Sequence, residues 1–137
     1  MNYANMAILC VDDEQIVLWS LRNQLDKYFS EDFRCEIAES VEEAWEVIEE
    51  LHEDEIRVLV IISDWLMPDV KGDEFLIDLH QRFPDVVTIL LTGQADREAI
   101  ERTQNYANLH AYLAKPWDEQ TLIQVIQSGL DKFNQLC

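Results

Sequence analysis

Short apolar runs alternate with amphipathic segments along the chain. Residues 6–11, 58–62 and 86–91 are apolar at nearly every position, and shorter runs lie near residues 35–38 and 111–114. Strict alternation would indicate a strand with one buried face, whereas an unbroken run indicates a strand covered on both faces. The runs therefore predict five strands of a parallel sheet.

The segments after the runs carry apolar residues at helical spacing. The predicted helix faces are Leu18, Leu21, Leu25 and Tyr28; Val41, Ala44, Ile48 and Leu51; Phe75, Leu76, Leu79 and Phe83; a weaker face of Ala95, Ala99, Thr103 and Tyr106; and Leu122, Ile126, Leu130 and Phe133. Ser40 and Glu43 form an S-x-x-E capping box before the second helix, and Asp118 is expected to cap the fifth. The pattern predicts an α/β fold of five β-α units, with right-handed crossovers and helices on both faces of the sheet.

Polar residues follow four of the five runs. Asp12 and Asp13 follow the first run, and Asp64 follows the run at residues 58–62. Thr92 and Lys115 follow the last two runs. Because all strands of a parallel sheet end at the same edge, these side chains should gather there, where open α/β sheets bind ligands.

The expected cluster fits phosphoryl chemistry. Three neighbouring carboxylates repel one another, and a hard divalent cation such as Mg²⁺ relieves that repulsion through oxygen ligands. An ammonium and a hydroxyl group then complement a tetrahedral phosphoryl group. The set predicts attack by an aspartate on a phosphoryl group, which depends mainly on positioning and charge stabilisation. No Ser-His-Asp, Cys-His or H-E-x-x-H pattern competes with it.

Length and charge narrow the class of protein further. A chain of 137 residues suits one domain. The net charge of −18 argues against a nucleic-acid surface and against docking on an anionic membrane. The longest apolar run, about six residues, is far too short to cross a bilayer. Three widely spaced cysteines and the absence of a secretion signal favour a cytoplasmic location.

Each polar residue also has a purely structural explanation when it is taken alone. Asp12 and Asp13 could cap the first helix, and Asp64 could be an ordinary loop acid. Thr92 could belong to a turn, and Lys115 could be solvated. Their joint occurrence at one edge favours a functional site. His52, His80 and His110 have no motif around them, and Trp19 and Trp45 are expected in the core or on helix faces.

Four linked motifs, in this order, resemble the receiver domain of two-component response regulators. They are I-L-C-V-D-D-E at residues 8–14, I-S-D-W-L-M-P-D-V-K-G at 62–72, L-L-T-G at 90–93 and Y-L-A-K-P-W at 112–117. The resemblance implies a flavodoxin-like (βα)5 doubly wound fold whose five parallel strands lie in the order 2-1-3-4-5. It implies a single receiver domain over residues 1–137, with its core at about 7–133.

The resemblance also implies roles for individual residues. Asp64 would be the phosphoacceptor. Mg²⁺ (or Mn²⁺) would be held directly by Asp13, largely through water by Asp12, and also by Asp64 and the backbone carbonyl of Leu66. Lys115 would pair with the phosphoryl group.

Two further residues carry the implied switch. Thr92 would bond a phosphoryl oxygen, and Tyr112 would change rotamer in concert with it. The peptide bond between Lys115 and Pro116 is expected to be cis, and Gly72 fits the turn that opens the third helix.

The function implied is a phosphorylation-dependent switch rather than an enzyme acting on other substrates. A sensor histidine kinase or phosphotransfer protein would phosphorylate the chain, which catalyses only its own phosphorylation and dephosphorylation. The fourth helix, fifth strand and fifth helix would then present a changed surface to a downstream output domain or protein. No direct nucleic-acid or membrane partner is expected.

Some alternatives stay open at this point. A Mg²⁺-dependent phosphatase of the haloacid dehalogenase type is disfavoured, because Asp12 and Asp13 are adjacent rather than spaced D-x-D. A purely structural α/β adaptor is a third interpretation. The chain could be a stand-alone receiver or part of a longer regulator, and the sequence does not decide whether phosphorylation drives homodimer formation.

Overall fold

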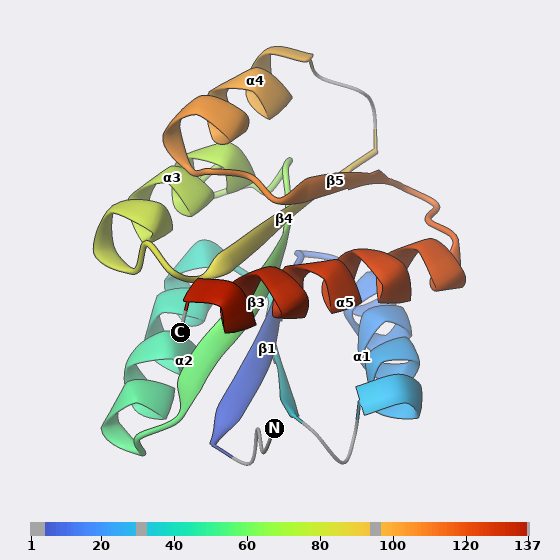
Figure 1. The fold of residues 1–137 in the computed structure, drawn as a ribbon. Coiled ribbons are helices and arrows are strands. Elements are labelled where there is room, and N and C mark those ends of the chain that lie inside the picture. The colour runs from blue at the N-terminus through green and yellow to red at the C-terminus, as the bar shows by residue number, and fades with distance from the viewer. Residues whose placement is uncertain (1–4, 30–32, 94–96, 137) are drawn as a thin grey trace.

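Five strands alternate with five helices in a computed structural model that describes residues 5–29, 33–93 and 97–136, with side chains to residue 132 (Figure 1). The strands are β1 (Met6–Val11), β2 (Arg34–Ala38), β3 (Arg57–Asp64), β4 (Val87–Thr92) and β5 (Ala111–Ala114). The helices are α1 (Gln15–Phe29), α2 (Val41–Glu53), α3 (Gly72–Arg82), α4 (Arg97–Tyr106) and α5 (Glu119–Leu136). The five apolar runs are therefore confirmed as strands, with ends within two residues of those expected.

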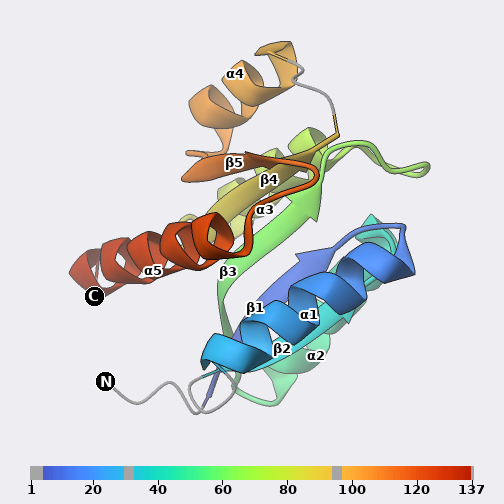
Figure 2. The ribbon, with the colours of Figure 1, turned by 90° about the vertical axis from the view of Figure 1, so that its right-hand side faces the viewer.

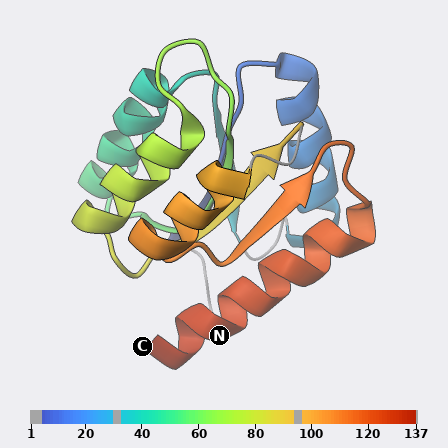
Figure 3. The ribbon, with the colours of Figure 1, turned by 90° about the horizontal axis from the view of Figure 1, so that it is seen from above.

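The strands form one parallel sheet in the order β2-β1-β3-β4-β5. Helices α1 and α5 cover one face, and α2, α3 and α4 cover the other (Figures 1 and 3). Figure 2, turned by 90° from the view of Figure 1, shows that α1 and α5 lie across the same face of the twisted sheet. The predicted fold, including the strand order implied by the resemblance, is confirmed.

The unbroken apolar runs serve two cores. Successive residues of β1 alternate between them: Ile8 and Cys10 pack with α1 and α5, whereas Leu9 and Val11 pack with α2 and α3. Each of these four side chains is at most 1% exposed. Covering of the sheet on both faces therefore accounts for the apolar character of consecutive positions.

Two predicted helix faces are corrected at their last positions. In α1, Tyr28 is 44% exposed and Phe29 is buried in its place, because Phe29 lies four residues after Leu25 on the inward stripe. Trp19, expected in the core or on a helix face, is 57% exposed on α1. In α4, Tyr106 is exposed and Ile100 is buried instead. Ala95 lies outside the described residues, as does the side chain of Phe133.

The predicted caps form with one change of partner. The Ser40 hydroxyl accepts a hydrogen bond from the Glu43 N–H at 3.1 Å. The Glu43 carboxylate accepts from the Glu39 N–H at 3.3 Å, rather than from Ser40 as in a standard capping box. At α5, the Asp118 carboxylate accepts from the Thr121 N–H at 3.1 Å.

The connection from β3 to α3 is closed at its far end by Gly72. The Gly72 N–H donates to the Trp65 carbonyl at 2.8 Å, and a Cβ added at Gly72 would overlap the backbone carbonyl of Asp64. This close approach of two backbone segments explains why the turn carries a residue without a side chain.

Among the described residues, no helix is both long and apolar enough to cross a bilayer.

Candidate functional site

Three carboxylates meet at the carboxyl edge of the sheet. Asp12 and Asp13 follow β1, and Asp64 ends β3, the neighbouring strand. One oxygen from each lies within 4.8 Å of the others. Asp12 and Asp64 are buried, and Asp13 is exposed. Parallel pairing of β1 with β3 thus brings together acids that lie about 50 residues apart in the sequence.

Lys115 reaches these carboxylates from the far side of β4. Its Nζ lies 2.7 Å from Oδ2 of Asp12 and 3.0 Å from Oδ1 of Asp64. The Lys115 N–H also donates to the Thr92 carbonyl at 2.7 Å. Burial opposes protonation of this amine, but its hydrogen bonds to the two carboxylates outweigh that effect and raise the pKa of Lys115.

One ammonium group does not neutralise the cluster. Burial, and after it the negative charge of Asp12, raise the pKa of Asp64 to about 6 even though Lys115 opposes both effects. The pKa of Asp12 is also raised, mainly by burial. The site therefore favours additional positive charge, or a proton, beside these acids.

Asp12 has a structural role in addition to its place in the cluster. Its Oδ1 accepts a hydrogen bond from the Glu14 N–H at 2.9 Å, at the start of α1. Its other oxygen contacts Lys115. The helix-capping explanation considered for this residue is therefore correct for one oxygen, and the second oxygen belongs to the cluster.

The remaining predicted residues lie around the same edge. Thr92 ends β4 and is buried, next to the strand that carries Asp64. Tyr112 lies on β5 opposite Leu90 and is 49% exposed. Leu66, in the loop after Asp64, has an exposed side chain. The Lys115–Pro116 peptide is cis, as expected.

The donor set suits a hard divalent cation. All three side chains offer carboxylate oxygens within 4.8 Å of one another, and Mg²⁺ and Mn²⁺ prefer such ligands over nitrogen or sulfur. A bound cation would also relieve the repulsion by Asp12 that, after burial, contributes to the raised pKa of Asp64. The residues present therefore fit the expected metal.

Two polar contacts around the site were not predicted from the sequence. The Asp69 carboxylate accepts a hydrogen bond from the Val41 N–H at 3.2 Å. Asp73, buried at the start of α3, pairs with Arg102 of α4 at 3.0 Å. Both contacts join segments almost 30 residues apart, so local pattern gives no signal for either, although acidic residues near helix starts are a weak one.

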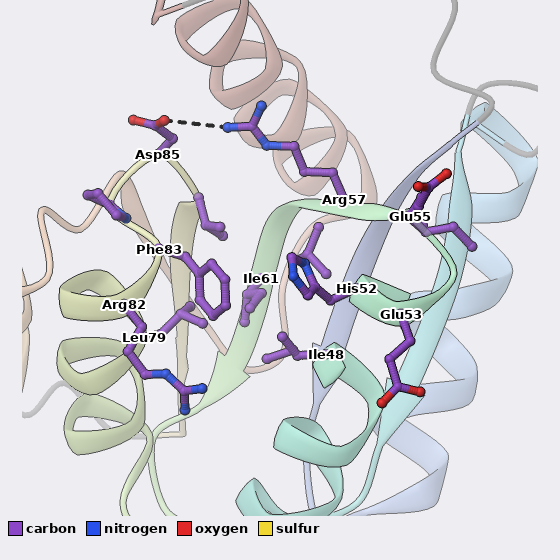
Figure 4. Close-up of a pocket in the computed structure, with 14 residues that line it drawn as sticks. Ile48, His52, Glu53, Glu55, Arg57, Ile61, Leu79, Arg82, Phe83 and Asp85 are labelled. Carbon is purple, nitrogen blue, oxygen red and sulfur yellow. Dashed lines mark hydrogen bonds and ion pairs between the residues drawn. The ribbon is translucent and has the colours of Figure 1, made fainter. Parts of the chain in front are cut away.

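A large groove lies at the opposite edge of the sheet. It has a volume of about 680 Å³ and runs between the last turns of α2 and α3, where Ile48, Ile61 and Leu79 form its apolar floor (Figure 4). An ion pair between Arg57 and Asp85, 3.4 Å long, spans one side. None of the predicted site residues lines this groove.

Comparison with known proteins identifies the class. The profile of the response regulator receiver domain matches residues 8–127, and the chain belongs to this family, whose members are phosphoacceptor signalling domains of two-component systems. This membership separates the chain from the phosphatases considered above.

Individual relatives fall within the same class. The chain is 33% identical over 133 residues to the hydrogenase transcriptional regulatory protein HoxA of Cupriavidus necator, covering 96% of this chain and 25% of HoxA. It is 28% identical to a chemotaxis protein CheY homolog of Campylobacter jejuni over 91% of this chain and 92% of the homolog. The chain thus spans about a quarter of the HoxA length and almost all of the CheY homolog.

Solved structures agree with this result. The signal receiver domain of an HD domain-containing protein from Pseudomonas fluorescens Pf-5 superposes with a TM-score of 0.86 at 26% identity, covering 96% of this chain and 99% of that one. A CheY-like receiver domain from Methanospirillum hungatei gives 0.85 at 28% identity, covering 98% and 100%.

Proposed function

We propose that this domain accepts a phosphoryl group on Asp64 from a partner histidine kinase or phosphotransfer protein, in a Mg²⁺-dependent reaction. The observation that carries the proposal is the position of Lys115, whose ammonium lies 3.0 Å from Asp64 in a cluster of three carboxylates. A purely structural ion pair would need one acid for one lysine. Here the acids are in excess, which suits a site that binds a cation and then a phosphoryl group.

Asp64 is the nucleophile in the proposed reaction. A carboxylate oxygen attacks the phosphorus of a phosphohistidine, a P–O bond forms as the P–N bond breaks, and the released imidazole takes a proton from solvent. With a pKa of about 6, Asp64 is mostly ionised at neutral pH. The Lys115 ammonium stabilises the negative charge of the transferred group.

Asp12, Asp13, Asp64 and the backbone carbonyl of Leu66 would hold the Mg²⁺ (or Mn²⁺). The metal, when bound, supplies the positive charge that offsets the carboxylates and the phosphoryl oxygens. Lys115 orients the acceptor Asp64 by direct contact, and it also contacts Asp12, which accepts a hydrogen bond from the Glu14 N–H.

The switch would run through Thr92 and Tyr112. Thr92 bonds the phosphoryl group, Tyr112 turns inward from its half-exposed position, and the surface of α4, β5 and α5 changes. The main-chain bond from Lys115 to Thr92 supports this coupling, because it joins the end of β4 to the end of β5.

The partners follow from the relatives by analogy. Hydrogenase transcriptional regulatory protein HoxA and the sensor kinase CckA of Brucella abortus are longer than the matched segment, which covers 25% and 12% of them. We propose that the domain, spanning residues 1–137 with its core at about 7–133, acts in the cytoplasm on an output domain or a separate target. The net charge of −18 favours protein contacts over direct contact with nucleic acid.

The first test is chemical phosphorylation. The 137-residue protein is incubated with Mg²⁺ and acetyl phosphate, and its intact mass is measured. One phosphoryl group should be added to the wild type and to Asp78→Asn, a control that alters an exposed acid on α3. Asp64→Asn should remain unmodified, and undiminished modification of this variant would refute the assignment.

Two other measurements test the alternative functions. Multiple turnover of a phosphate ester would favour an enzyme, and tryptophan fluorescence that is unaffected by Mg²⁺ would favour a structural adaptor.

A further inference from the structure

The loop between Asp64 and α3 is held at several points. At its start, the Trp65 N–H donates to the Leu91 carbonyl at 2.8 Å. Met67 inserts a buried side chain into the core under α2 and α3. Leu66, whose carbonyl belongs to the proposed metal site, lies between these two residues, so its position depends on how firmly the loop is held.

Asp69 supplies a contact of another kind, because it joins this loop to a different element. Its Oδ2 accepts a hydrogen bond from the Val41 N–H at 3.2 Å. Val41 is the first residue of α2, so no carbonyl within that helix can accept its N–H. The Ser40 hydroxyl accepts from Glu43 instead. The Asp69 carboxylate therefore completes the N-terminus of α2, where a negative charge is favourable.

Asp69 is separate from the metal cluster. Among the described residues, the acids whose oxygens gather within 4.8 Å are Asp12, Asp13 and Asp64. Asp69 is exposed and follows Leu66 by three residues. An effect of Asp69 on metal binding would therefore act through the loop backbone or through long-range charge, and these two routes predict different results for different substitutions.

We propose that Asp69 is a positioning residue, which fixes the β3–α3 loop against the N-terminus of α2 and so presents the Leu66 carbonyl to the divalent cation. The inference rests on the proposed function. In this proposal Asp69 affects metal affinity through its hydrogen bond with the Val41 N–H and not through its charge. The start of α2 thereby becomes part of the framework of the site, although α2 contributes no ligand.

Two substitutions separate the bond from the charge. Asp69→Ala removes both, whereas Asp69→Asn removes the charge and keeps a carbonyl oxygen that can accept from Val41. Mg²⁺ affinity is measured by isothermal titration calorimetry on the full chain. Asp69→Ala should weaken binding about three- to tenfold, less than the roughly 10–100-fold loss common for partners that hold a metal ligand directly. Asp69→Asn should stay within about twofold of the wild type.

Asp78→Ala is the matched control, because it removes an exposed acid from α3 with no hydrogen bond to α2. Amide hydrogen exchange at Val41 provides a readout without metal: exchange should accelerate in Asp69→Ala and remain slow in Asp69→Asn. Unchanged Mg²⁺ affinity in Asp69→Ala, or equal weakening in both Asp69 variants, would overturn the inference and leave the proposed function standing. Absence of Mg²⁺ binding by the wild type would overturn both.

Discussion

At the scale of single residues, the main feature of this receiver domain is a shortage of positive charge. The Lys115 ammonium is shared between Asp12 and Asp64, at 2.7 and 3.0 Å. Both carboxyl groups nevertheless have raised pKa values, with burial as the largest cause. The acids therefore make the metal-free fold less stable than it would be with one of them neutral.

This shortage predicts that the metal-free protein gains stability from Asp64 on mild acidification. The folded-state pKa of Asp64, about 6, exceeds the ordinary value of 3.8, so the folded protein binds this proton more tightly than the unfolded chain. The penalty is present above pH 6 and is relieved as the pH falls toward 4. Between about pH 7.5 and 5.5 the relief should be about 1 kcal/mol, measured by urea unfolding with a chelator present.

Asp64→Asn is the reference for this measurement, because it cannot take up the proton. The lowered pKa of His110, caused chiefly by burial, acts in the opposite direction in both proteins and cancels in the comparison. An identical pH response of the two proteins would contradict the prediction.

The sequence predicts that several residues of the candidate site lie close together, but it gives no signal for others. Asp12, Asp64 and Lys115 each follow a strand, and parallel strands end at one edge, so their meeting could be predicted. Asp69 and its partner Val41 lie in two different loop–helix junctions. Their contact depends on the path of the loop in space, which hydrophobic periodicity does not encode.

At the scale of elements, the junction of β3 and α3 tolerates no added atom. Gly72→Ala should lower the free energy of unfolding by about 1–3 kcal/mol, because its Cβ would overlap the Asp64 carbonyl and force the backbone to move. Phosphorylation of Asp64 by acetyl phosphate should slow as well. Gly93→Ala is the control, since an added Cβ there would meet no described atom within 4 Å apart from its chain neighbours. Equal stability of the two variants in urea would contradict this account.

Helix α4 is attached to α3 by an ion pair whose loss should be measurable. Asp73 is 1% exposed and pairs with Arg102, which is 50% exposed. Arg102→Ala should cost about 1–3 kcal/mol, because a buried carboxylate is left without a counter-charge, although solvent near the exposed arginine reduces the effect. Arg97→Ala, in the same helix, should change stability by less than about 0.5 kcal/mol.

A double variant tests the reason for that loss. Asp73→Ala combined with Arg102→Ala removes both charges, so it should be less destabilised than the two single losses predict when added. Additive losses in urea unfolding would indicate that Arg102 contributes packing alone.

The elements themselves could be predicted better than their inward stripes. Three nearly unbroken apolar runs located β1, β3 and β4, whose two faces are both covered, and shorter apolar runs located the edge strands β2 and β5. The predicted inward face of α1 ends at Tyr28, whereas the buried residue is Phe29. Both side chains are aromatic, so only packing distinguishes them. The Asp73–Arg102 pair could not be predicted, since it joins two helices.

At the scale of the whole molecule, a net charge of −18 is distributed over 137 residues. Mutual repulsion of these charges opposes the compact state and is screened by salt. Raising KCl from about 20 to about 200 mM should therefore increase the free energy of unfolding by about 1 kcal/mol. Mg²⁺ at the same ionic strength should add more stability in the wild type than in Asp64→Asn, because the proposed metal site forms only in the folded state. Equal effects of Mg²⁺ and KCl in urea unfolding of the wild type would argue against a specific site.

The strand order has a consequence for the newborn chain. A ribosome adds residues from the N-terminal side, so β1 is made before the other strands, yet one of its two neighbours, β3, is made some 50 residues later. Lys115 is added after all three acids of the cluster. During translation the three acids of this edge are therefore made before Lys115, the cation that contacts Asp12 and Asp64 in the described structure.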